Sequence, residues 1–132
     1  MSSSESQSIS QRIKQIIEKQ ATAWETADSD KIIADFADDG LFIVPGSSLR
    51  GKQQIKEAAD NYFAEFTDTK VIIKRIIVNG NEGAVEWSWR EKNKKTGEES
   101  QAEDAIIFEM EKEKIKYWRE YIDKPSQQNE KG

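Results

Sequence analysis

The chain has 132 residues, which suits one domain with one hydrophobic core. It carries 20 basic and 25 acidic residues, and the net charge of −5 argues against nucleic-acid binding, which depends on Lys and Arg neutralising phosphates. Because the sequence lacks histidine and cysteine, it excludes a histidine general base, histidine-based metal sites, a disulfide framework and a thiol nucleophile. We therefore expect a cytoplasmic protein without metal or cofactor, whose acid–base chemistry would fall to Asp, Glu, Lys or Tyr.

The first part of the chain predicts one amphipathic helix after a polar end. Residues 1–7 are rich in serine, so we expect them to be disordered, and they lack the pattern of a signal peptide. Ser8 or Ser10 is the expected cap of a helix that runs to about Thr26. No apolar run approaches the roughly 20 residues of a membrane helix, so no membrane partner is expected. The apolar residues of the predicted helix share one face: Ile9, Ile13, Ile16, Ile17 and Trp24.

A second helix and a short strand are expected next. Asp30 suits the N-cap of a helix over 31–36. The sequence Asp-Asp-Gly at 38–40 then predicts a turn. Four consecutive apolar residues at 41–44 predict a short strand that is buried on both faces and stopped by Pro45.

The remainder predicts a third helix and then a sheet. A loop over 47–51 leads to a helix over about 52–66, after which the apolar period changes from that of a helix to that of a strand. Asn-Gly at 79–80 is a strong hairpin signal between the first two long strands. The helices would lie on one face of this meandering sheet, which is an α+β plan. A curved sheet closed by helices encloses a conical cavity. The expected long strands are 71–78, 84–92, 101–110 and 116–123.

Strict alternation assigns the side chains of these strands to two faces. Trp87 and Trp89 share one face, and we interpret it as the inner wall of a pocket for a planar or hydrophobic molecule, although the rings could simply fill the cone. On the first long strand, alternation groups 71, 73, 75 and 77 against 72, 74, 76 and 78. The opposite face of the sheet carries a mixture of Glu, Arg and Tyr, which suits either a solvated surface or a protein interface.

Two acids fall on the predicted inner face. Asp104 and Glu120 lie on adjacent strands, where burial and mutual repulsion would keep one of them protonated near neutral pH, so that one acts as acid and the other as base. Alternatively, each carboxyl is a satisfied polar group that accepts hydrogen bonds from Gln20, Tyr62 or an indole N–H. Arg50 or Arg75 could instead pair with one of them.

The order of elements, together with several short sequence motifs, resembles the SnoaL-like domains of the nuclear transport factor 2-like superfamily. The motifs are FADDG at 36–40, Pro45, LRGK at 49–52 and the closing stretch 114–123. The resemblance implies a cystatin-like cone, in which three N-terminal helices pack on a strongly curved, mostly antiparallel sheet. It places this domain at 8–123, between the polar residues 1–7 and a polar tail at 124–132, and it implies a homodimer through the outer sheet face.

The enzymes of this superfamily have catalytic sets that the sequence matches only in part. In the ketosteroid isomerase pattern, Val44 stands where the base belongs and Gln20 where a tyrosine belongs, whereas Asp104 matches the protonated aspartate. In the limonene epoxide hydrolase pattern, Glu120 matches an acid of the last strand. Trp87 and Trp89 replace the Arg and Asp of that pattern, and Leu41 and Ile43 replace its Tyr and Asn.

These observations predict a binding site for a small hydrophobic or aromatic molecule, with cofactor-free isomerase or lyase chemistry at Asp104 and Glu120. The alternatives are a non-catalytic dimeric binding or assembly module and a cone filled by its own side chains. The expected pocket residues are Gln20, Trp24, Phe42, Val44, Tyr62, Phe66, Trp87, Trp89, Phe108 and Trp118.

Overall fold

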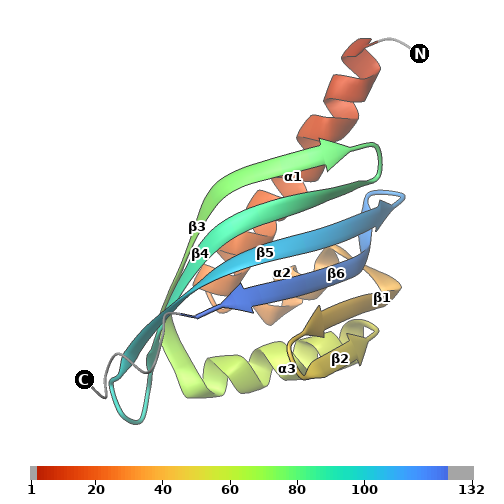
Figure 1. The fold of residues 1–132 in the computed structure, drawn as a ribbon. Coiled ribbons are helices and arrows are strands. Elements are labelled where there is room, and N and C mark those ends of the chain that lie inside the picture. The colour runs from red at the N-terminus through yellow and green to blue at the C-terminus, as the bar shows by residue number, and fades with distance from the viewer. Residues whose placement is uncertain (1–2, 125–132) are drawn as a thin grey trace.

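The structure, a computed structural model, describes residues 3–124 and the side chains from residue 8 onward. Three helices, α1 (Ser3–Glu25), α2 (Ser29–Ala34) and α3 (Lys52–Glu65), lie on one side of a six-stranded sheet (Figure 1). We call the sheet face that the helices cover the inner face and the opposite one the outer face. In the described part of the chain, no helix combines the length and the apolar character needed to cross a membrane.

Helix α1 begins earlier than expected. Its first residue is Ser3, so the expected caps Ser8 and Ser10 lie inside the helix, and residues 1–2 fall outside the described part of the chain. The predicted apolar face is otherwise confirmed, because Ile13, Ile17 and Trp24 are buried, while Ile9 is partly exposed. The polar tail expected at 124–132 lies outside the described residues from 125 onward.

The segment after α1 differs from the prediction in two respects. Asp28, rather than Asp30, caps α2, since its side chain accepts a hydrogen bond from the backbone N–H of Lys31. The expected turn at 38–40 lies inside a longer strand, β1 (Phe36–Val44). The pairing of β1 with β6 is irregular at this point. Phe36 and Leu41 are five residues apart in β1, but their partners Ile115 and Tyr117 are only two residues apart in β6, so β1 bulges between them.

The loop expected at 47–51 is largely a strand, β2 (Ser47–Arg50), which pairs with β1 in an antiparallel hairpin around Pro45 and Gly46. The turn of this hairpin contains Gly46, which has a positive φ of 82° that glycine adopts without strain. What the local sequence did not show is that the chain folds straight back, so that residues 47–50 pair with 41–44.

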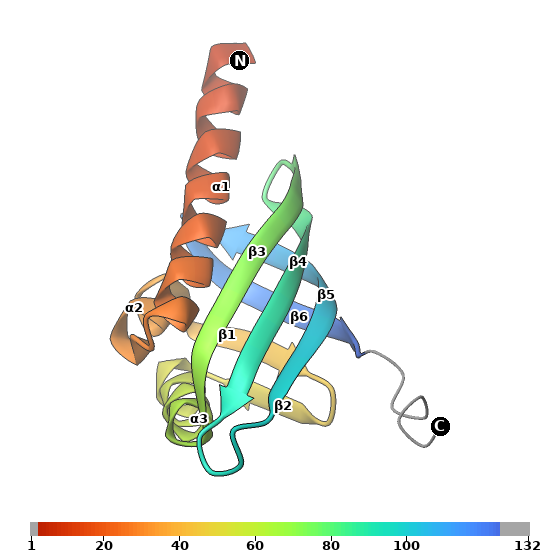
Figure 2. The same ribbon diagram turned by 90° about the vertical axis from the view of Figure 1, so that its left-hand side faces the viewer.

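Four long strands complete the sheet: β3 (Phe66–Asn79), β4 (Glu82–Asn93), β5 (Glu99–Glu111) and β6 (Lys114–Asp123). The order across the sheet is β2-β1-β6-β5-β4-β3, and among the described strands only β1 and β6 pair in parallel. The long strands twist and curve around the helices (Figure 2). The α+β class, with N-terminal helices packed on a curved and mostly antiparallel sheet, is therefore confirmed.

A bulge in β3 corrects the predicted division of its side chains. The pairing with β4 slips between Ile73 and Arg75, so the alternation reverses there. As a result, Ile76 and Val78 pack against the core, whereas Ile77, which alternation had grouped with Val71 and Ile73, is exposed.

Large side chains from the helices and the inner face fill most of the cone. Trp87 and Trp118 are fully buried at its centre, and their ring centroids lie 5.8 Å apart. In the described part of the chain, the other large side chains that are fully buried are Phe36, Phe108, Ile17, Ile32, Ile55, Ile106, Ile115, Val85 and the polar Gln20.

Candidate functional site

The sheet register brings the two predicted acids to the same place. Asp104 of β5 pairs with Trp87 on one side and Ile122 on the other, and Glu120 of β6 pairs with Ile106. Asp104 and Glu120 are therefore diagonal neighbours on adjacent strands, and their side chains share the inner face. Both are buried, with 3% and 9% of their surface exposed.

Of the two carboxyl oxygens of Asp104, one accepts a hydrogen bond and the other has no partner among the described residues. The indole N–H of Trp87 donates to its Oδ2 atom over 3.2 Å. Its Oδ1 atom is buried and has no hydrogen-bond partner among the residues that the structure describes. Burial raises the pKa of Asp104, because removal from water disfavours the charged form, while the Trp87 hydrogen bond acts in the opposite direction.

Glu120 is held in a similar way by a second tryptophan. The indole N–H of Trp118 donates to its Oε2 atom over 2.9 Å. Burial, followed by the nearby negative charge of Asp104, raises the pKa of Glu120 from 4.5 to about 8. At neutral pH Glu120 therefore keeps its proton, and burial disfavours the charged form of Asp104 in the same direction.

Of the partners considered for these acids, only the indole groups contact them. Gln20 is fully buried but donates to the carbonyl oxygen of Ile32 and to Asp35, which ties α1 to the end of α2. Arg75 pairs with Glu86 on the outer face. Arg50 donates to the backbone carbonyl of Asp39, on the exposed surface of the β1–β2 hairpin.

A cavity of about 300 Å³ opens beside the two acids, between the inner face and the helices. Trp24 of α1, Tyr62 of α3 and Trp89 of β4 form its aromatic walls. Seven of the twelve predicted site residues line it: Trp24, Phe42, Val44, Tyr62, Trp89, Asp104 and Glu120.

The other five predicted residues lie behind the cavity wall or beside it. Trp87, Phe108 and Trp118 are fully buried in the core, where two of them hold the acids from behind. Phe66 stacks on Tyr62, with centroids 5.1 Å apart. Gln20 belongs to the α1–α2 contact described above.

Glu91 is a site residue that the sequence interpretation missed. It lines the cavity and accepts hydrogen bonds from the Tyr62 hydroxyl at 2.8 Å, the Trp89 indole at 2.9 Å and the Ser100 hydroxyl at 3.0 Å. Burial is the main cause that raises the pKa of Tyr62, so this hydroxyl stays protonated and can donate. The available signal was simple, because Glu91 follows Trp89 by two residues and therefore shares its face.

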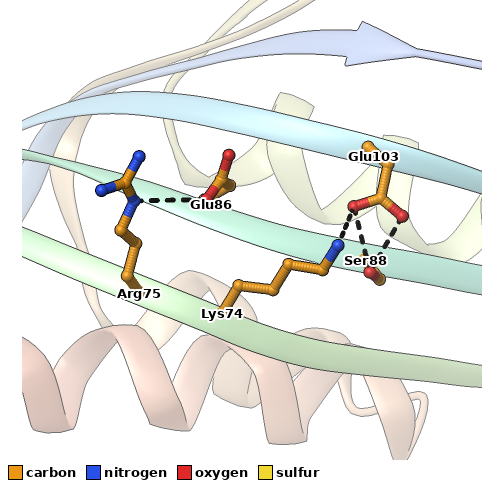
Figure 3. Close-up of polar contacts among 5 residues, drawn as sticks. All are labelled: Lys74, Arg75, Glu86, Ser88 and Glu103. Carbon is orange, nitrogen blue, oxygen red and sulfur yellow. Dashed lines mark hydrogen bonds and ion pairs between the residues drawn. The ribbon is translucent and has the colours of Figure 1, made fainter.

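The outer face carries a separate polar network (Figure 3). Lys74 of β3 contacts Glu103 of β5 at 2.7 Å, and Ser88 of β4 donates to the same carboxyl. Arg75 pairs with Glu86 at 3.2 Å. Lys74 lowers the pKa of Glu103, while exposure keeps this network in contact with solvent. These charges therefore stay on the opposite side of the sheet from Asp104 and Glu120.

Comparison with known proteins gives both a family and a set of structural neighbours. The family model described as SnoaL-like domain matches residues 17–118. No curated protein matches the sequence. All of the structural neighbours described next are below 25% identity, so they bear on the fold alone.

Three solved structures illustrate the likeness. A protein with a ketosteroid isomerase-like fold from Catenulispora acidiphila, in complex with trimethylamine, has a TM-score of 0.76 at 20% identity, over 80% of this chain and 83% of that one. An LEH-like epoxide hydrolase from M. tuberculosis has a TM-score of 0.76 at 22% identity, over 86% and 84%. A ketosteroid isomerase-like protein from Erwinia carotovora atroseptica has a TM-score of 0.70 at 23% identity, over 86% and 95%.

Proposed function

The chain belongs to the SnoaL-like domain family, and we propose that it binds a small molecule with an apolar body in the 300 Å³ cavity and moves protons on it with Asp104 and Glu120. The proposal includes the domain limits 8–123 and the cytoplasmic setting expected from the sequence. The observation that carries it is the placement of two buried acids, both with raised pKa values, in the wall of one aromatic cavity.

The pair suits cofactor-free isomerisation or elimination. In its ionised form Asp104 takes a proton from a carbon atom of the bound molecule, and Glu120 gives its own proton to the atom on which negative charge develops or to the departing group. Proton exchange between the two acids, directly or through water, restores the starting state. Because Trp87 and Trp118 fix one oxygen of each acid, the acids need little reorganisation during the transfer.

The cavity has the size and surface of a small-molecule site. Its volume of about 300 Å³ is at the lower end of the range usual for such sites. The neighbour from Catenulispora acidiphila was solved with a small amine, which supports ligand binding within this fold. The catalytic sets of ketosteroid isomerase and of limonene epoxide hydrolase are incomplete here, so we propose neither of those reactions.

Filling the cavity tests the binding part of the proposal. Ala58 of α3 lines the cavity, whereas Ala64 of the same helix is exposed, so Ala58→Leu and Ala64→Leu form a matched pair. We expect ligand-observed NMR with a set of small aromatic fragments to detect binding to the wild type and to Ala64→Leu, and none to Ala58→Leu. Equal binding by both variants would place the ligand elsewhere.

Removing each acid tests the catalytic part. Once a substrate is found, Asp104→Asn and Glu120→Gln should abolish turnover and leave binding largely intact, because each change keeps the shape of the side chain. Glu111→Gln, at the exposed end of β5, is the control. Turnover at the wild-type rate in both acid variants would remove the mechanism.

A non-catalytic dimeric module is the second candidate, and the outer face favours it. Ile77 and Ile107 are 53% and 44% exposed and stand in one cross-strand row, since both pair with Ala84. Tyr121, half exposed, lies under the guanidinium of Arg119, which is on the strand that pairs with Ile107. Tyr and Arg are enriched at protein interfaces, and the exposed isoleucines add apolar surface that a partner would bury.

We infer that a second copy of the chain covers this face. Sedimentation across a concentration series should show a dimer for the wild type and a monomer for the double variant Ile77→Lys/Ile107→Lys. Ile9→Lys, on the partly exposed part of α1, should remain dimeric. A wild type that stays monomeric throughout the series would exclude the homodimer.

A further inference from the structure

Glu91 stands at one end of the cavity and the two buried acids stand at the other. On β4, Glu91 pairs with Ser100 of β5. Trp87 pairs with Asp104, which lies four residues further along β5 and therefore roughly 13 Å away along the strand, at about 3.3 Å for each residue. Glu91 is partly exposed, whereas Asp104 is buried. We therefore take the Glu91 end as the open end, where a ligand enters.

The carboxyl of Glu91 is fixed in the cavity wall. Its Oε1 atom accepts from the Tyr62 hydroxyl and the Trp89 indole, and its Oε2 atom accepts from the Ser100 hydroxyl. A carboxyl whose two oxygens only accept has the pattern of an ionised carboxylate. Hydrogen bonds from neutral donors orient this charge and do not cancel it. Because a movement of the carboxyl would break three bonds, the negative charge stays beside the cavity.

The rest of the lining offers an anion no buried cation. Asp104 and Glu120, at the far end, are acids. The basic residue among the described lining residues is Lys124, whose side chain is exposed and therefore surrounded by water. A carboxylate ligand would lose hydration among the aromatic walls and would also meet the charge of Glu91. A neutral molecule of the same shape avoids both costs.

We propose that Glu91 determines the ligand class of the cavity, which admits uncharged aromatic or apolar molecules and rejects carboxylates of the same shape. This inference rests on the proposed function, because it concerns the ligand of the same cavity. The role of Glu91 is in specificity and is separate from proton transfer by Asp104 and Glu120. Two like charges about 6 Å apart, at effective dielectric constants of about 20 to 80, change a binding constant by roughly three- to a hundredfold.

Benzamide and benzoate test the inference with the intact wild-type protein, because they share a shape and differ in charge. Titrations followed in 1H–15N NMR spectra at pH 7 give both dissociation constants, and about 0.15 M salt screens distant charges. We expect the wild type to bind benzamide at least about tenfold more tightly than benzoate. Equal or tighter binding of benzoate would overturn the inference and leave the proposed cavity function standing. Binding of neither molecule would overturn both.

Two variants test whether Glu91 is the cause. Glu91→Gln removes the charge and keeps the shape, while Ser100→Lys keeps Glu91 and places an ammonium at an exposed position beside it. In each variant we expect the preference for benzamide to fall below about threefold. Glu111→Gln, at the exposed end of β5, should keep the wild-type preference. A preference that stays near tenfold in both variants, or an equal fall in Glu111→Gln, would overturn the role of Glu91.

Discussion

Replacing Glu120 by glutamine tests whether this buried carboxyl keeps its proton in the folded protein. Burial and the charge of Asp104 raise the pKa of Glu120 from 4.5 to about 8. Between these two values the folded state retains a proton that the unfolded chain has released. The free energy of unfolding of the wild type therefore falls as pH rises through this window, and the fall is complete above about pH 8.

The size of the effect follows from the width of the window. A rise from 4.5 to about 8 corresponds to at most about 5 kcal/mol, at 1.36 kcal/mol for each pH unit. Glutamine cannot ionise, and its amide imitates the protonated acid, with an oxygen that accepts from the Trp118 indole. The variant should therefore match the wild type near pH 5 and exceed its unfolding free energy at pH 9, by up to this limit.

Urea unfolding followed by tryptophan fluorescence measures this difference at pH 5, 7 and 9. Glu111→Gln, the exposed control, removes the same charge and should follow the wild type at each pH. The reasoning fails if the difference in unfolding free energy between Glu120→Gln and the wild type does not grow from pH 5 to pH 9. It also fails if the control shows the same growth, because the effect would then come from net charge alone.

Three further substitutions have defined outcomes. Gly83→Ala should destabilise the protein by roughly 2 kcal/mol or more in urea unfolding, because its new methyl group would overlap β3 backbone and come within 2.6 Å of the Phe108 ring; an unchanged midpoint would contradict this. Tyr62→Phe should cost about 1–2 kcal/mol in the same assay, since it removes a hydroxyl that bonds three side chains, and a neutral result would count against the network at the cavity. Lys74→Ala should raise the pKa of Glu103 in an NMR titration, and a pKa that does not move would show that the ion pair is absent in solution.

The inner face of the long strands was predictable because one physical rule governs it. Alternation places Trp87 and Trp89 together, and the same rule places Asp104 and Glu120 together once their strands are adjacent. The structure confirms these placements. Extending the rule by one step to Glu91 would have completed the group of acids that line the cavity.

The misplaced features depend on contacts that the local sequence does not contain. Asp38–Asp39–Gly40 reads as a turn, but pairing of β1 with β6 draws these residues into a strand with an irregular register. The reversal of faces within β3 likewise arises from its slipped pairing with β4 at residues 73–75, and no residue type there announces a bulge. Gln20 was expected at the pocket because the resemblance places it where a tyrosine belongs, whereas its amide donates to the Ile32 carbonyl of α2, a contact that the local sequence does not contain.

The size of the cavity could not be predicted from the sequence either. Counting tryptophans could not decide whether they fill the cone or line a space in it. The structure shows that both occur: Trp87 and Trp118 fill the centre, while Trp24 and Trp89 border an opening.

The parallel pairing of β1 with β6 has a consequence for how the protein is made. β1 and its hairpin partner β2 reach the rest of the sheet only through β6, which is synthesised about 70 residues after β1. The ribosome must therefore release β6 before the first two strands can join the sheet. Until then, Phe36 and Phe42 lack their packing contacts with Trp118. A premature stop codon before residue 114 would leave this hairpin exposed to other nascent chains, so such a truncated product should depend on chaperones or be degraded.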